Sequence, residues 1–242
     1  MGGVFARGLL RIGCPIYPVT RSMDIDTAAK NTPNPALVLV TVVENDLHSV
    51  LKKLPKVWHD RVGLLQNELL PRDWRAHSLQ QPTVIVVWFE KKKGQDYKVI
   101  IPSPVHGPCT ALIAQALQSL DIPCQSLRTQ GDLMFELVRK NVYILTTNIA
   151  GLVTGGTVGE LWARHEELAR QVANEVMDIQ AWLTAAKLPR ESVIAGMVDA
   201  FNADPQHQCT GRSAPARLTR ALQFADEARL SVPKLREIKA SI

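Results

Sequence analysis

The chain has 242 residues, of which 46% are hydrophobic, so it can bury one or two hydrophobic cores. No apolar run reaches the roughly 20 residues of a membrane-spanning helix, and no membrane partner is expected. The net charge of +5 is modest, spread along the chain and interleaved with few aromatic residues. A nucleic-acid partner is therefore not expected, whereas a small anionic molecule explains the excess of positive charge equally well.

Cysteine usage indicates a reducing compartment. Cys14, Cys109, Cys124 and Cys209 are scattered, without a CxxC pair or the spacing of metal ligands. The sequence therefore predicts reduced thiols, no metal site and a cytoplasmic location.

The N-terminal stretch predicts a helix and then a strand. Apolar residues recur at helical spacing over Gly3–Ile12, and Gly13 ends the helix. Cys14–Thr20 is expected to be a strand, followed by the basic Arg21 and a polar connector over Ser22–Pro35. A helix led by glycines and a strand that ends at a basic residue are typical of the second part of a dinucleotide-binding unit.

The following segments predict a mainly parallel α/β arrangement. Ala36–Val43 is continuously apolar, as in a parallel strand buried on both faces, and Glu44–Asp46 is expected to cap a helix. Arg61–Leu65 is expected to be a strand, and Gln66–Glu68 follows its carboxyl end, where ligands bind in open α/β sheets. A hydrogen-bonded turn amide is the alternative interpretation. Further expected elements are a hairpin over Pro82–Pro102 with its turn at 91–96, a helix over Thr110–Leu120 and a strand over Ile122–Leu127.

From Asp132 onward the sequence predicts only helices, and we expect a domain boundary between residues 129 and 130. Residues 1–129 would form the α/β domain, and residues 130–242 an all-helical one. After a first helix over Leu133–Ala150, the expected helices are Thr157–Lys187, Arg190–Ala203, Ser213–Leu230 and Pro233–Ala240.

The first of these helices is apolar nearly all round, yet it contains Lys140, Asn141 and Asn148. Lys140 and Asn148 are eight residues apart, which places them on neighbouring parts of one face, about 12 Å apart along the axis. Such polar groups either pair within the core or line a wet cleft. The pattern alone leaves both interpretations open.

Taken together, these motifs resemble the ketopantoate reductase (2-dehydropantoate 2-reductase) family, within the 6-phosphogluconate-dehydrogenase-like oxidoreductases. The resemblance covers nearly the whole chain. It rests on motifs at the family's spacing, namely Gly2-Gly3 with Arg21, the run Leu37–Leu51, Leu64–Asn67, Arg139-Lys140 with Asn148 and Gly159–Leu161, and Gly211-Arg212 with Val232-Pro233.

The resemblance implies a fold and an activity. The fold would be an N-terminal Rossmann-like domain with a parallel sheet, incomplete at the N-terminus, and an all-α domain for substrate binding and homodimerisation. The activity would be NADPH-dependent reduction of a 2-oxo acid or similar carbonyl compound. In the family this is the step from 2-dehydropantoate to pantoate in pantothenate biosynthesis. The family's first strand and the first two glycines of its fingerprint are not in the given sequence.

The resemblance also assigns roles to individual residues. Lys140 would be the general acid that protonates the carbonyl oxygen. Gly2 and Gly3 would belong to the turn that binds NADP, and Arg21 would contact its 2′-phosphate. Asn67 would lie beside the nicotinamide and the substrate, and Asn148 would orient the substrate.

Several positions depart from the family pattern. Ile144 replaces an asparagine, Pro215 a glutamate, Val43 a frequent lysine and Ala203 a serine that binds the substrate carboxylate. These departures leave the substrate open. They also support a second hypothesis, a catalytically impaired dinucleotide-binding or interaction protein that keeps the fold.

A cluster of polar residues near the C-terminus is open to two interpretations. Arg212, Ser213 and Arg217 could rebuild an anion-binding rim, or they could simply form a solvated helix start.

Overall fold

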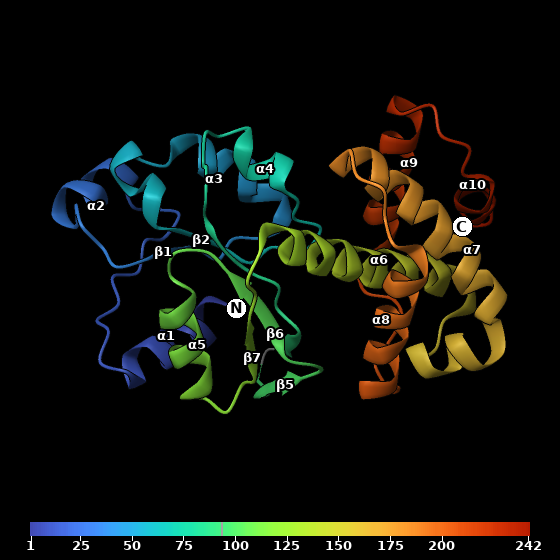
Figure 1. Cartoon of the computed structure of the whole chain (residues 1–242), viewed down its shortest axis with the longest axis horizontal. Helices are drawn as coiled ribbons and strands as arrows, with labels where there is room; N and C mark the ends of the chain where they lie inside the picture. Colours follow the sequence, from blue (N-terminus) through green and yellow to red (C-terminus); the bar gives the residue numbers. More distant parts are fainter. Residues whose placement is uncertain (93) are drawn as a thin grey trace. The chain divides into compact units, whose positions relative to one another are not determined.

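The computed structural model describes residues 1–92 and 94–242, and the chain divides into two compact units, Met1–Glu136 and Leu137–Ile242. The first unit combines a sheet with helices, and the second is all-helical (Figure 1). Residue 93, in the turn expected at 91–96, lies outside the described residues. Within the described residues, no helix combines the length and the apolar character needed to cross a membrane.

A five-stranded sheet forms the centre of the first unit, with strand order β1-β2-β3-β6-β7. β1, β2 and β3 are mutually parallel, β6 is antiparallel to β3, and β7 is parallel to β6. The register aligns Val38 with Val62, and Gly63 with Thr83. The strands are β1 (Val38–Val40), β2 (Val62–Leu64), β3 (Thr83–Ile85), β6 (Ser103–His106) and β7 (Cys124–Ser126). A mainly parallel sheet of the Rossmann-like kind is thereby confirmed.

The prediction of a strand at Cys14–Thr20 is wrong. This segment is irregular, and its apolar side chains Tyr17 and Val19 are 48% and 41% exposed. Two of its residues, Pro15 and Pro18, have no backbone N–H to donate to a ladder. In the described part of the chain, neither sheet includes these residues as a strand. Apolar composition alone therefore did not suffice to form a strand.

The mainly apolar segment that starts at Thr83 contributes one strand to each of two sheets. Its first part is β3 in the central sheet, and its last part is β4 (Phe89–Lys91), which pairs antiparallel with β5 (Tyr97–Val99). Between them, the backbone N–H of Trp88 donates to Ser103 Oγ at 2.9 Å. The expected hairpin is therefore confirmed only for β4 and β5, and the sequence analysis missed β6 as a separate strand.

Helices lie on two sides of this sheet, with α1 and α5 together on one side and α3 and α4 on the other (Figure 1). The helix expected at Gly3–Ile12 is confirmed, and Gly13 after it has a positive φ of 82°. The sequence analysis missed α2 and α4. The bounds are α1 (Gly2–Arg11), α2 (Ile25–Asn31), α3 (Leu47–Lys53), α4 (Pro71–Arg75) and α5 (Thr110–Gln118), with 3-10 turns η1 (Glu44–Asp46) and η2 (Lys56–Arg61).

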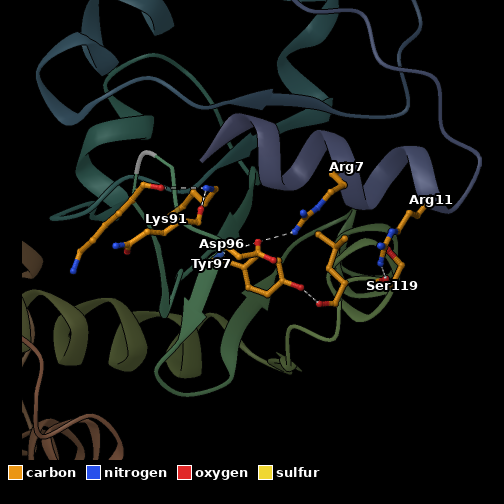
Figure 2. Close-up of polar contacts among 9 residues, drawn as sticks. Arg7, Arg11, Lys91, Asp96, Tyr97 and Ser119 are labelled. Atoms are coloured by element: carbon orange, nitrogen blue, oxygen red, sulfur yellow. Dashed lines mark hydrogen bonds and ion pairs between the residues drawn. The ribbon is translucent and has the colours of Figure 1, made fainter.

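Polar side chains of α1 connect this helix to the β4–β5 hairpin and to the end of α5 (Figure 2). Arg7 pairs with Asp96 at 3.2 Å and lies over the Tyr97 ring, 5.1 Å from its centroid. The Tyr97 hydroxyl donates to the Leu120 carbonyl, and Arg11 Nη1 donates to the Ser119 carbonyl at 2.6 Å. Because these contacts come from several elements, the helix has a defined position over the sheet.

The contact between α1 and α5 depends on a glycine. A Cβ atom at Gly8 would lie 2.4 Å from the Ala116 carbonyl oxygen and 3.0 Å from the Ala116 carbonyl carbon. The inner face of α1 continues this contact with the buried Val4 and Phe5, which join the apolar core of the sheet. Gly8 therefore lets the helix backbones approach closely enough for that core to close.

The second unit is built of helices, as the resemblance implied. α7 begins at a capping box, in which Glu160 N donates to Thr157 Oγ1 at 3.3 Å and Thr157 N donates to Glu160 Oε2 at 2.9 Å. α7 packs against α8, α9 and α10. The bounds are α6 (Gln130–Thr154, which begins in the first unit), α7 (Val158–Thr184), α8 (Arg190–Ala203), α9 (Ala214–Glu227) and α10 (Pro233–Ala240).

Candidate functional site

Lys140 lies on α6 and is 8% exposed. The residues around it in the helix, such as Leu137, Val138 and Ile144, are buried as well. Burying an ammonium group is costly unless other groups compensate its charge. Lys140 therefore occupies a buried position of an apolar helix. Its role as a catalytic acid stays a prediction.

Asn148 lies two turns further along α6 and has well-defined partners in the second unit. Its Nδ2 donates to the Cys209 carbonyl at 3.2 Å, and its Oδ1 accepts from Arg217 Nη1 at 2.8 Å. The two bonds fix the orientation of the amide, because they use the donor and the acceptor on opposite sides of the group. The Asn148 amide is therefore fixed in one orientation by protein partners.

For Arg217 the sequence left two interpretations open, part of an anion-binding rim or part of a solvated helix start. The second interpretation is wrong for Arg217, which is only 8% exposed, although Arg212 and Ser213 are exposed. The signal was present in the sequence: Ala214, Leu218 and Ala221 recur at helical spacing, and Arg217 falls on the same face. Pro215, at the family's glutamate position, is exposed in the first turn of α9 and supplies no acid.

The segment at Cys209 approaches α6 closely because residue 151 is a glycine. A Cβ atom at Gly151 would lie 2.6 Å from the Cys209 Cβ and 2.7 Å from the Thr210 Cγ2. Burial, and secondarily the charge of Glu160, raise the pKa of the Cys209 thiol to about 11. This thiol therefore stays protonated at neutral pH and is not a nucleophile.

Two other motif positions in the second unit have structural roles. The buried Asn141 donates to Gln180 Oε1 at 3.1 Å, which is the internal pairing left open by the sequence. A Cβ atom at Gly159 would lie 2.9 Å from the Pro205 carbonyl oxygen, so this glycine admits the loop at Pro205 against the start of α7. These residues shape the unit without needing a ligand.

In the first unit, Gly2 and Gly3 form the N-terminus of α1. A Cβ atom at Gly2 would lie 2.9 Å from Thr41 Oγ1, so the helix starts beside the residue that follows β1. At Gly3 a Cβ atom would meet nothing within 4 Å. The helix therefore starts at the carboxyl edge of the sheet, where ligands bind in α/β folds.

Arg21 lies beside an acidic residue. Its Nη2 donates to Asp46 Oδ2 at 2.6 Å, and its side chain is 87% exposed. Asp46 comes directly before α3. An exposed ion pair of this kind is weak, so a phosphate group could displace the carboxylate from Arg21.

The two polar residues after β2, Gln66 and Asn67, differ in their surroundings. Gln66 is buried, donates through Nε2 to the carbonyls of Val40 at 2.8 Å and Val42 at 3.2 Å, and accepts from Leu65 N. Gln66 therefore joins the ends of β1 and β2, as in the turn-amide interpretation. Asn67 is half-buried in the following turn, and its side chain makes no hydrogen bond to residues 1–92 or 94–242.

A polar cluster that the sequence analysis did not mention lies between α3 and α4. His48 Nδ1 is 2.9 Å from His77 Nε2, and His48 Nε2 is 3.8 Å from Asp73 Oδ1. Burial, and then the charge of His48, lower the pKa of His77, whereas burial raises the pKa of Asp73. In the described part of the chain, no three His, Cys, Asp or Glu side chains form a group suited to a metal ion.

No protein-family model matches the sequence, and no curated protein matches it. Solved structures do resemble it. A PanE/ApbA family ketopantoate reductase from Ralstonia eutropha JMP134 has a TM-score of 0.60 and 18% identity, over 99% of this chain and 91% of that chain. A dimeric ketopantoate reductase from Staphylococcus aureus has a TM-score of 0.58 and 16% identity, over 85% and 75% of the two chains.

A D-mandelate dehydrogenase, in a ternary structure with NADH and anilino(oxo)acetate, also resembles the chain. Its TM-score is 0.59 at 13% identity, over 84% of this chain and 73% of that chain. At these identities the comparisons establish the fold. The chain has the fold of ketopantoate reductases and related oxidoreductases, and the resemblance seen in the sequence motifs is confirmed at that level.

Proposed function

Starting from the fold of the ketopantoate reductases, we propose that this protein reduces a 2-oxo acid or a related small carbonyl compound with NADPH. The first unit would bind the dinucleotide, and the helical unit would bind the small anionic substrate and form a homodimer. The observation that carries the proposal is the buried Lys140 on α6, with the oriented amide of Asn148 two turns away on the same helix.

The N-terminus of α1 fits a dinucleotide. Its first two residues, Gly2 and Gly3, have no side chains to block a pyrophosphate, and the space at Gly3 is open. The free N–H groups and the positive end of the helix dipole favour an anion there. Arg21 would pair with the 2′-phosphate of NADP in exchange for Asp46, and Asn67 would contact the nicotinamide end.

The bound dinucleotide would supply a hydride to the carbonyl carbon. The ammonium group of Lys140 would donate a proton to the carbonyl oxygen, so that the C=O group becomes CH–OH. Its positive charge would also stabilise the negative charge that develops on this oxygen. Asn148 and Asn67 would orient the substrate through neutral hydrogen bonds.

The substitution Lys140→Met tests the proposal, because it removes the proton donor and keeps an apolar side chain of similar length. We expect the turnover of 2-oxo acids to fall by about 10²- to 10⁴-fold. The shift in melting temperature caused by NADPH should be retained. The matched control is Lys187→Met at an exposed position, which should leave turnover at the wild-type level.

The second candidate function is a dinucleotide-binding protein that has lost turnover. Ile144 and Pro215 favour it, because neither can make the hydrogen bonds of the family's asparagine and glutamate. This candidate predicts an NADPH-dependent melting shift without reduction of any 2-oxo acid, and no effect of Lys140→Met beyond stability. Absence of a shift with either NADPH or NADH would contradict both candidates.

A further inference from the structure

We infer that Asp46 lowers the preference of this protein for NADPH over NADH, because its carboxylate pairs with the arginine proposed to bind the 2′-phosphate of NADPH. The inference rests on the proposed dinucleotide binding and adds a residue that determines the choice of cofactor. It is carried by the contact between Arg21 and Asp46, by the exposure of this contact to solvent and by its position in the first unit.

The first argument is the geometry of the contact. Arg21 Nη2 donates to Asp46 Oδ2 at 2.6 Å, as short as a charge-assisted hydrogen bond. The side chain of Arg21 is 87% exposed and that of Asp46 is 38% exposed, so an anion from solvent can reach the guanidinium group. A phosphate that binds there either displaces the carboxylate or lies beside it. Both arrangements weaken binding, the first by breaking an ion pair and the second by repulsion between like charges.

The second argument is the location of the contact. A Cβ atom at Gly2 would lie 2.9 Å from Thr41 Oγ1, so the N-terminus of α1 adjoins Thr41. Asp46 follows Thr41 by five residues, which span at most about 18 Å of extended chain. This limit is comparable to the length of an extended dinucleotide. A nucleotide whose pyrophosphate lies at the N-terminus of α1 can therefore extend towards Arg21 and Asp46.

The third argument is the chemistry of the loop at Arg21. Thr20 and Ser22 flank the arginine, their hydroxyl oxygens are 3.1 Å apart, and all three residues are exposed. Hydroxyl groups can donate to phosphate oxygens, so the loop suits a phosphate group except for the carboxylate of Asp46. Val43, where the family often has a lysine, is 58% exposed and adds no positive charge. NADH has a neutral 2′-hydroxyl group in place of the phosphate and leaves the ion pair intact.

Two competing explanations give Asp46 a different role. In the first, its carboxylate accepts a hydrogen bond from a ribose hydroxyl of NADH, as acidic residues do in many NAD sites. In the second, the ion pair is an ordinary surface contact without influence on nucleotides. The discriminating quantities are the Kd values of NADPH and NADH, because only our inference predicts that loss of the carboxylate strengthens NADPH binding and leaves NADH binding unchanged.

The experiment measures both Kd values by calorimetric titration of the full chain, which needs no turnover. Asp46→Asn should raise the ratio of the NADH Kd to the NADPH Kd by about 2- to 5-fold, the change that corresponds to an exposed ion pair. Asp46→Glu keeps the carboxylate and should keep the ratio near the wild-type value. In a chain that already carries Arg21→Met, Asp46→Asn should change the ratio less, because no guanidinium group remains to be released.

Asp60→Asn is the matched control, because it removes the same charge from a 73% exposed side chain that precedes β2, away from the carboxyl ends of the strands. It should leave the ratio unchanged. The inference alone is overturned if both nucleotides bind and Asp46→Asn leaves the ratio unchanged, weakens NADH binding, or has the same effect with and without Arg21. A wild type that binds neither nucleotide would contradict the proposed function, and the inference with it.

Discussion

Replacing Gly8 by alanine should destabilise the first unit, although alanine is the better helix former. The new Cβ atom would lie 2.4 Å from the Ala116 carbonyl oxygen. Ordinary C···O contacts start at about 3.3 Å, so α1 and α5 would have to separate by roughly 1 Å. Overpacking of this kind costs about 1–3 kcal/mol, and the helix propensity of alanine returns about 1 kcal/mol. The net loss should be about 1–2 kcal/mol.

Urea unfolding followed by circular dichroism measures this loss, and thermal unfolding should show a fall in Tm of about 2–4 °C per kcal/mol. Gly3→Ala is the matched control on the same helix, because a Cβ atom there meets nothing within 4 Å. That variant should be as stable as the wild type or up to about 1 kcal/mol more stable, because alanine favours the helix and meets no clash there. A Gly8→Ala protein as stable as the Gly3→Ala protein, or more stable, would refute the close approach of the two helices.

Two further predictions concern polar groups of the first unit. Gln66→Leu should lower the free energy of unfolding by about 1–3 kcal/mol, measured by urea titration, because it leaves the carbonyls of Val40 and Val42 without their donor. The pKa of His77 is lowered by burial and by the His48 charge, so the folded state favours its neutral form. The associated stability is present above about pH 6.5 and is lost as the pH falls through the lowered pKa. His77→Asn should flatten this acid-side decline in urea midpoints, and an unchanged decline would contradict the reasoning.

Much of the fold could be predicted from local patterns. Helical periodicity predicted α1, α8 and α10 within a residue of their observed ends, because each carries a clear apolar face and a clear stop. The same patterns missed α2 and α4, which are short and mostly polar. They also predicted a strand at Cys14–Thr20, where pairing decides the outcome. A strand forms only when a second strand is placed to hydrogen-bond with it, and that placement depends on the tertiary fold.

In the candidate site, too, local patterns predicted positions along a helix but not contacts between distant segments. The positions of Lys140 and Asn148 on one helix follow from the period of that helix alone. The contact between Asn148 and Arg217 joins residues 69 positions apart, and no local pattern contains it. Gln66 shows the converse, since a polar residue after a strand suggested a ligand site, but its hydrogen bonds join two strands.

The close approach at Gly151 has a consequence for which substitutions this protein can tolerate. The residue makes no proposed contact with any ligand, yet a methyl group there would push away the peptide at Cys209, which holds the Asn148 amide. Mutational scanning should therefore find position 151 intolerant, for reasons unrelated to catalysis.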